Sequence, residues 1–344
     1  MNKYNYRFSF GPWNIHEGAD PFGPPVRPTI IFADKLPLYK ELGYDAVQFH
    51  DDDAVPDLDR LSPAQIRAQA KATRKMLEDH GLVAEFVAPR LWEHPKTVDG
   101  AFTANDDKVR KYAIERAKIS VDIGNEIGTD LMVLWLAREG TYLREAKNAA
   151  AAAHQLIDAI NILLEYDEKL RIAVEPKPNE PMDLAYIPTM GHGLALGMAT
   201  QDPDRVGVLM ESAHAILAGL DPSDEISFAM SFKKLWSVHL NDQNGLKFDQ
   251  DRSFGSVDLR RAFNQVRVLD DNHYWEVGMV GMDVKALRTQ PAELATKHLR
   301  NSIEIFIRLV ELNRSLDQDL VSSLIASRDY EELDWLILTS LLGS

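Results

Sequence analysis

The chain has 344 residues and no cysteine, so it can form one large domain or two small ones, and disulfides, thiolate metal sites and a cysteine nucleophile are excluded. Its formal net charge of −15 argues against nucleic acid or an anionic membrane as a partner, because neither would attract an acidic protein. No apolar run reaches the roughly 18 residues that span a bilayer, and the first residues lack a signal-peptide core, so we expect a cytoplasmic protein.

Short β-rich runs alternate with longer amphipathic stretches along the chain. The eight expected strands cover residues 7–13, 44–50, 82–88, 130–136, 170–175, 205–211, 234–241 and 277–283. The most regular expected helices cover 31–42, 62–80, 107–126, 143–166 and 288–312, and two more are expected in 315–344. Eight βα units without a second composition class predict a (β/α)8 TIM barrel over residues 1–312, followed by a short C-terminal helical tail over 313–344.

Nearly every expected strand ends on a polar or aromatic residue, and in such barrels the carboxyl ends of the strands carry the chemistry. The residues at these ends are Trp13, His50 with Asp53, Trp92, Trp135, Glu175 with Lys177, Glu211 with His214, His239 with Asn241, and Asp283. Because side chains alternate along a strand, Glu175 and Lys177 face the same cavity. Pro176 and the prolines that follow it resist further ladder pairing and make this strand end rigid.

Four of these residues are candidate ligands of one divalent cation. They are Glu175, Glu211, His239 and Asp283. Oxygen and nitrogen donors of this kind suit Mg, Mn or Co. The alternative is a set of rim salt bridges with Lys177 and Lys285, since Asp and Glu are seldom buried without a partner. Four candidates on successive strand ends favour the metal.

A second cation is suggested by four residues that include Glu211. They are Glu211, His214, Asp249 and Asp251. Glu211 would bridge the two cations, and such a pair polarises both oxygens of a reacting group together. Two alternatives stay open on spacing alone: the Asp-x-Asp stretch is more commonly a turn with Asx bonds, and His214 can be a satisfied core histidine.

His50 and Asp53 form a candidate catalytic pair, because an aspartate three residues on can turn back to the imidazole N–H and fix its tautomer. The alternative is a polar rim of solvated aspartates. Trp13, Trp92 and Trp135 are core residues when met singly, but at strand mouths they would line an apolar pocket of the type that stacks on sugar faces.

Several motifs resemble those of the xylose isomerase family, in its shorter actinobacterial type, between about residues 7 and 290. Matching stretches include Phe8-Ser-Phe-Gly-Pro-Trp13, Phe49-His-Asp-Asp-Asp53 and Asp283-Val-Lys285. Glu175-Pro-Lys-Pro-Asn-Glu-Pro181 and Lys247-Phe-Asp-Gln-Asp251, in this order, are highly specific. The resemblance implies a TIM-barrel aldose–ketose isomerase with two divalent cations per chain, Mn, Co or Mg, and a small-molecule sugar as substrate. It implies ring opening followed by a metal-assisted hydride shift between C2 and C1.

The resemblance also implies individual roles. Glu175, Glu211 and Asp283 match structural-metal ligands, and His214, Asp249 and Asp251 match ligands of a catalytic metal that Glu211 bridges. His50, oriented by Asp53, matches the ring-opening residue, and Lys177 matches the lysine that binds the substrate carbonyl oxygen. Trp13, Trp92 and Trp135 match the pocket walls, and Asn241 and Lys285 lie in matching motifs at the substrate. Phe22 matches an aromatic lent to a neighbouring subunit, which implies a homodimer or homotetramer.

Two departures from the family pattern bear on these expectations. His239 stands where the family has an aspartate, and a nitrogen donor should favour Mn or Co over Mg. The family's long C-terminal arm is mostly missing after about residue 313. Three other functions stay open: a related isomerase or epimerase using enediol proton transfer and one metal, a non-catalytic sugar-binding protein, and a phosphodiesterase, which the acidic charge disfavours.

Overall fold

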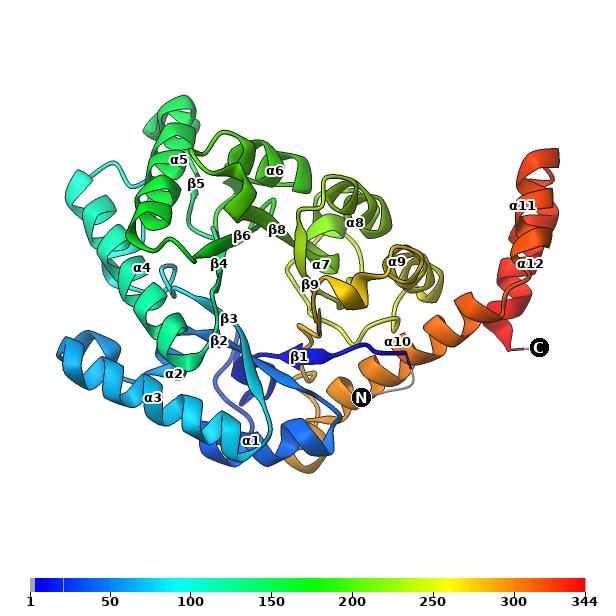
Figure 1. The fold of residues 1–344 in the computed structure, drawn as a ribbon, viewed down its shortest axis with the longest axis horizontal. Helices are drawn as coiled ribbons and strands as arrows, with labels where there is room; N and C mark the ends of the chain where they lie inside the picture. Colours follow the sequence, from blue (N-terminus) through cyan, green and yellow to red (C-terminus); the bar gives the residue numbers. More distant parts are fainter. Residues whose placement is uncertain (1–3, 21, 344) are drawn as a thin grey trace.

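The computed structural model describes residues 4–20 and 22–343. Eight parallel strands close into a barrel in the order β1-β10-β9-β8-β6-β4-β3-β2, with helices around it (Figure 1). The barrel strands are β1 Phe8–Phe10, β2 Ala46–His50, β3 Val83–Ala88, β4 Leu131–Trp135, β6 Arg171–Glu175, β8 Val206–Glu211, β9 Leu235–His239 and β10 Val280–Gly281. The predicted (β/α)8 TIM barrel is confirmed.

The other elements lie outside the barrel wall. The helices are α1 Phe32–Glu41, α2 Asp51–Ala54, α3 Pro63–Asp79, α4 Asp107–Ile127, α5 Ala149–Tyr166, α6 Met190–Met198, α7 Ser212–Leu217, α8 Pro222–Ser231, α9 Leu259–Asp271, α10 Lys297–Ser315, α11 Gln318–Ser327 and α12 Tyr330–Leu342. Two short strands, β5 Gly140–Thr141 and β7 Leu184–Ala185, pair antiparallel above the wall. None of the described helices is long and apolar enough to cross a membrane.

Local sequence explains where most elements begin and end. The helix α4 starts after Asp106, whose side chain accepts a hydrogen bond from the Lys108 N–H, and it ends at Gly128 in the left-handed conformation. The strands are rich in Val, Leu, Phe and Ala and are mostly buried on both faces, as expected for a parallel sheet covered by helices.

Several expected boundaries shift in the structure. The last strand shrinks from 277–283 to β10. The first shrinks from 7–13 to β1, because a 3-10 turn over Pro12–Asn14 replaces its end. The helix expected from 143 starts at Ala149, because Asn148 caps its first turn with a side-chain bond to the Ala151 N–H. The helix expected from 288 starts only at Lys297, after a 3-10 turn that follows Pro291.

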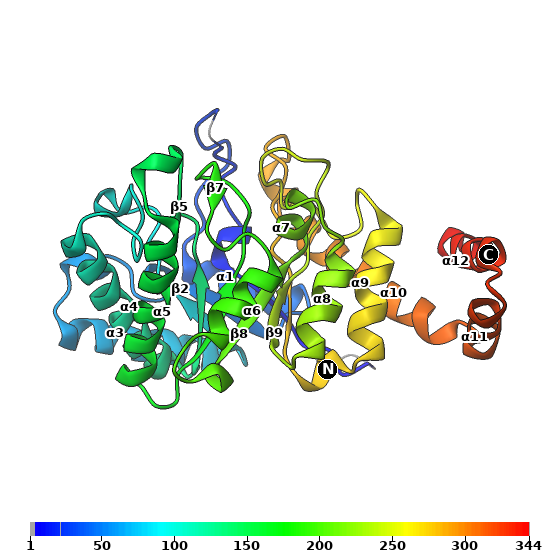
Figure 2. The same cartoon turned by 90° about the horizontal axis from the view of Figure 1, so that it is seen from above.

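The C-terminal helices project away from the barrel. Figures 1 and 2 show α10 reaching out from the barrel and carrying α11 and α12 at its far end. Arg260 of α9 forms an ion pair with Asp334 of α12. Ile337 of α12 is buried in the large apolar core of the protein. The carboxyl ends of the barrel strands carry long loops. The loop between β1 and α1 rises above the barrel in Figure 2.

Candidate functional site

Strand register brings the first expected ligand set together. Trp135 of β4 pairs with Glu175 of β6, and Glu211 of β8 pairs with His239 of β9, so each pair lies side by side at the carboxyl ends of neighbouring strands. The Nδ1 atom of His239 lies 3.4 Å from Glu175 Oε1, 3.5 Å from Glu211 Oε2 and 3.6 Å from Asp283 Oδ2. Three carboxylates therefore converge on one imidazole nitrogen.

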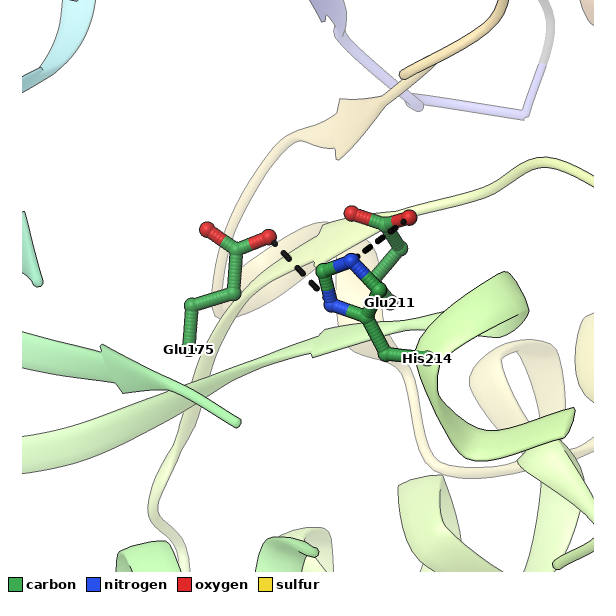
Figure 3. A group of neighbouring side chains, drawn as sticks. All are labelled: Glu175, Glu211 and His214. Carbon is green, nitrogen blue, oxygen red and sulfur yellow. Dashed lines mark ion pairs between the residues drawn. The ribbon is translucent and has the colours of Figure 1, made fainter. Parts of the chain in front are cut away.

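His214 faces the same carboxylates from the start of α7. Its Nε2 atom lies 3.3 Å from Glu211 Oε1, and its Nδ1 atom lies 3.7 Å from Glu175 Oε1. Figure 3 shows the two carboxylates turned toward this imidazole, one from the end of β6 and one from the end of β8. His214 is thus not packed among apolar core residues but belongs to the acidic cluster.

The loop after β9 adds the remaining carboxylates. Asp249 Oδ2 lies 3.2 Å from His214 Nε2 and 2.9 Å from Lys177 Nζ. Asp251 is buried and forms an ion pair with Lys285. Glu180 holds this loop, since its Oε2 accepts hydrogen bonds from the Asp249 N–H and from Lys177 Nζ.

All seven expected metal ligands fall into groups that fit a cation. The groups are Glu175, Glu211 and His214; Glu211, His239 and Asp283; and Glu211, Asp249 and Asp251, and within each the candidate ligand atoms lie within 4.8 Å of one another. Several of these atoms are buried and have no hydrogen-bond partner among the described residues: both ring nitrogens of His239, Nδ1 of His214 and Oδ1 of Asp249. Buried nitrogen and oxygen atoms of this kind, without hydrogen-bond partners and beside carboxylates, are suited to bind a divalent cation.

The pKa shifts have the same origin in buried, crowded charge. Burial and the Asp249 charge raise the pKa of Glu211 well above its ordinary value. Burial and the same charge also raise the pKa of Asp251. Burial alone would lower the pKa of His239, but Glu175 outweighs it and raises that pKa well above 6.5. All three shifts arise from negative charge crowded away from water, which a bound cation would offset.

A second cluster surrounds His50 at the end of β2. His50 Nδ1 lies 3.0 Å from Asp53 Oδ2 and 2.7 Å from Arg90 Nη2. Trp13 stacks on the His50 ring at a centroid distance of 4.1 Å, and Trp92 meets it edge-on at 5.0 Å. Burial alone would raise the pKa of Asp53, but the hydrogen bond and charge of His50, followed by Arg90, lower it.

Both clusters open into one cavity of about 1090 Å³ at the carboxyl ends of the strands. Its wall includes His50, Lys177, Lys285, the expected metal ligands, and the three tryptophans of the pocket wall, Trp13, Trp92 and Trp135. Lys177 Nζ lies 5.1 Å from the centroid of the Trp135 ring. Burial alone would lower the pKa of Lys177, but Asp249 and Glu180 outweigh it and raise that pKa, so this side chain is a cation at neutral pH.

Two residues expected to bind the substrate, Phe22 and Asn241, differ in their place relative to the cavity. Phe22 lies at the cavity mouth and is 89% exposed, in the loop between β1 and α1. Asn241 is buried behind the wall, where its amide nitrogen donates to Glu211 Oε1 at 2.9 Å and to Asp251 Oδ1 at 3.1 Å. The side chain of Asn241 therefore orients carboxylates, and it does not line the cavity.

Three contributing residues did not emerge as candidates from sequence. Asn14 donates to Asp283 Oδ1 at 2.6 Å, Glu180 supports Asp249, and Arg90 contacts His50. Glu180 lies within a matching motif and Asn14 follows Trp13, so both carried a local signal. Arg90 comes from the loop after β3, and nothing in its sequence neighbourhood indicates that it reaches β2.

Comparison with known proteins agrees with the barrel fold. Residues 36–301 match the family model described as xylose isomerase-like TIM barrel. The chain is similar to a D-tagatose 3-epimerase-like protein, with a TM-score of 0.63 and 14% identity over 90% of this chain and 98% of that one. It is also similar to the 3-keto-D-glucoside 4-epimerase of E. coli, with a TM-score of 0.62 and 14% identity over 88% and 99%. The IolI protein with a bound zinc atom gives a TM-score of 0.64 and 15% identity over 90% and 100%.

Proposed function

Because the chain belongs to the xylose isomerase-like TIM barrel family, we propose that it is a metal-dependent aldose–ketose isomerase acting on a small sugar. The observation that carries the proposal is the set of seven candidate carboxylate and imidazole ligands with Glu211 at its centre, several of whose buried atoms lack hydrogen-bond partners within the described residues. The same cavity holds a lysine and an apolar aromatic wall, as a polyol substrate requires.

We propose that the ligand set holds two divalent cations. Glu175, Glu211, His239 and Asp283 would hold the first, because the three carboxylates surround His239 Nδ1. Glu211, His214, Asp249 and Asp251 would hold the second. When bound, such cations act as Lewis acids that polarise the oxygens at C1 and C2 during a hydride shift between these carbons. We propose Mn or Co as the native metal, because His239 supplies nitrogen and removes one negative charge.

The chain's own residues bind and orient the sugar. Lys177 donates to the substrate carbonyl oxygen and stabilises negative charge there, since its ammonium faces the cavity beside Asp249. His50 contacts the cyclic sugar during ring opening, and Asp53 lies beside its imidazole and accepts a hydrogen bond from the His50 backbone N–H. Trp13, Trp92 and Trp135 stack on the sugar and exclude water from the site.

The second candidate function is a sugar epimerase or isomerase that works by enediol proton transfer with one cation. His239 favours it, because the resemblance has an aspartate there and a lower ligand charge suits a single metal. A non-catalytic sugar-binding protein would share the tryptophan wall but would have no use for Lys177.

Turnover in heavy water separates these functions. The purified protein, assayed with Mn, Co and Mg separately on a panel of aldoses and ketoses, should interconvert one pair without incorporating deuterium at C1. Substantial deuterium at C1 would establish the enediol route instead. Replacement of Lys177 by Met should lower kcat by about 10²–10³, the usual cost of losing one donor to a developing oxyanion. The control Lys247→Met removes an exposed lysine of the loop after β9 and should keep the activity.

Absence of turnover for every sugar would contradict the proposed enzyme, and retention of sugar binding in that case would support the binding protein.

We also propose a cytoplasmic homodimer. The exposed Phe22 at the cavity mouth supports a dimer, because this position suits an aromatic that reaches a neighbouring subunit.

A further inference from the structure

Three polar atoms meet beside the His50 ring. Arg90 Nη2 lies 2.7 Å from His50 Nδ1 and 3.2 Å from Asp53 Oδ2, while His50 Nδ1 lies 3.0 Å from the same oxygen. The nitrogen of the imidazole is therefore within hydrogen-bond distance of a guanidinium and of a carboxylate at once.

Only one of these two bonds can exist in a given tautomer. A guanidinium has donors alone, and an ionised carboxylate has acceptors alone. If Nδ1 carries a proton, it donates to Asp53 and faces the Arg90 N–H groups with an N–H of its own. If Nδ1 is bare, it accepts from Arg90, and the second N–H on Arg90 Nη2 serves Asp53. The shorter of the two distances is the one to Arg90.

Arg90 is held firmly in this position. Its Nε atom donates to Asp52 Oδ1 at 2.7 Å, and its Nη1 atom donates to Glu93 Oε1 at 3.2 Å. The backbone N–H of Arg90 donates to Asp51 Oδ1 at 3.2 Å, and Asp51 is itself buried in an ion pair with Arg116 of α4. The guanidinium cannot swing away from His50 without breaking these bonds.

The imidazole is equally constrained. Trp13 stacks on one face of His50 and Trp92 meets the ring edge-on. Asp53 keeps a second bond whatever the tautomer, because its Oδ2 also accepts from the His50 backbone N–H at 3.3 Å. Within the described residues the other ring nitrogen, Nε2, has no hydrogen-bond partner, and the ring lies on the cavity wall.

We propose that Arg90 is a positioning residue that keeps His50 Nδ1 as an acceptor, so that the proton sits on Nε2 and His50 presents an N–H donor to the substrate. The inference rests on the proposed function, in which this cavity takes a cyclic sugar. An N–H donor recognises the ring oxygen of the sugar, which has lone pairs only, whereas a bare Nε2 would recognise a hydroxyl. Arg90 thereby decides which oxygen of the sugar His50 binds.

Nitrogen NMR of the full-length protein without sugar tests the tautomer directly. Long-range correlations of ¹⁵N-labelled imidazoles, with His50 assigned from the His50→Gln variant, should show a proton on Nε2 at neutral pH. In Arg90→Met the proton should move to Nδ1, where it donates to Asp53. In Asp53→Asn it should stay on Nε2, because Arg90 remains. The control Arg138→Met removes another cavity arginine, one that bonds the Trp92 carbonyl, and should change nothing.

A proton on Nδ1 in the unmodified protein, a doubly protonated ring, or an unchanged tautomer in Arg90→Met would overturn the proposal. Should Arg90→Met fail to fold, the unmodified protein and Asp53→Asn still decide the question. These spectra contain no sugar, so their outcome is independent of the proposed isomerase.

A binding comparison tests the consequence for recognition. D-xylose should bind about 10-fold more tightly than its carba analogue, in which CH₂ replaces the ring oxygen, because one hydrogen bond is lost. In Arg90→Met this ratio should approach 1. If the unmodified protein and Arg90→Met gave the same ratio of affinities, the role of Arg90 in recognition would be overturned. Failure of D-xylose to bind while Nε2 carries the proton would count against the proposed substrate and leave the tautomer assignment standing.

Discussion

At the scale of single residues, Glu211 occupies the centre of the candidate metal site. It belongs to all three groups of converging ligand atoms, it ends β8, and Asn241 orients its carboxylate from the next strand end. Burial raises its pKa well above the ordinary value, because the charged carboxylate is cut off from water. An ionised carboxylate in such a buried position requires a positive charge beside it.

His298 allows a prediction about pH. It is buried at the start of α10, where its Nε2 bonds the Asn14 carbonyl at 3.0 Å, and burial lowers its pKa from 6.5 to about 4. A depressed folded-state pKa means that stability is full above pH 6.5 and is lost as the pH falls toward 4. The loss from this residue is about 3 kcal/mol, because a difference of one in pKa corresponds to about 1.36 kcal/mol.

The variant His298→Gln should therefore lose about 3 kcal/mol less than the parent between pH 7 and pH 4. Urea unfolding at several pH values measures this difference, and comparison with the parent cancels the acid sensitivity of the carboxylates. The variant His154→Gln, which changes an exposed histidine of α5, serves as the control. Parallel pH curves for His298→Gln and the parent would refute the assignment.

Residue identity and spacing predicted most of the candidate site. Glu175 and Lys177 follow the alternation of one strand, and His214 follows Glu211 by three residues, so local geometry places each pair. The contact of Arg90 with His50 joins the ends of β2 and β3 and depends on a side-chain conformation. No local pattern carries that information.

At the scale of elements, the metal site depends on which strand ends are neighbours. Neighbouring strands β6, β8 and β9 deliver Glu175, Glu211 and His239, and the loop after β9 returns Asp249 and Asp251 to the same point. Glu211 belongs to all three groups of candidate ligands, whereas Asp249 belongs to one. Removing Glu211 should therefore affect metal binding more than removing Asp249.

Metal analysis after equilibrium dialysis against Mn tests this arrangement. The parent chain should hold two cations, Glu211→Ala should hold none, and Asp249→Ala should keep one, because the group of Glu211, His239 and Asp283 stays complete. Asp204→Ala, which removes a fully exposed carboxylate, should still hold two. One cation in the parent chain would contradict the two-metal proposal and favour the enediol candidate.

At the scale of the whole molecule, two features face outward from the barrel. The loop between β1 and α1 rises above the barrel (Figure 2), and α11 and α12 extend from α10. This loop carries Phe22, which lines the cavity. The last helix exposes Trp335 by 61% and Leu342 by 83%. Exposed apolar side chains of this size are typical of surfaces that meet another chain.

We predict that the protein sediments as a dimer or larger oligomer at micromolar concentration. Analytical ultracentrifugation measures the mass. Phe22→Ala should lower kcat/KM for the sugar by weakening substrate contact in the neighbouring subunit, with little change in thermal stability because Phe22 is exposed. A monomer with unchanged kcat/KM in Phe22→Ala would contradict the prediction. Val98→Ala, at another exposed apolar residue, is the matched control.

The sequence by itself determined the eight βα units, because hydrophobic periodicity and turn residues act over a few positions, and it identified the acidic and imidazole side chains at the strand ends. Only the tertiary structure decided that seven of them converge around Glu211, that Asn241 lies behind the wall, and that Arg90 competes with Asp53 for His50. Closing the barrel joins residues far apart in the chain, and hydrogen-bond partners across strand ends depend on distances that no sequence interval encodes.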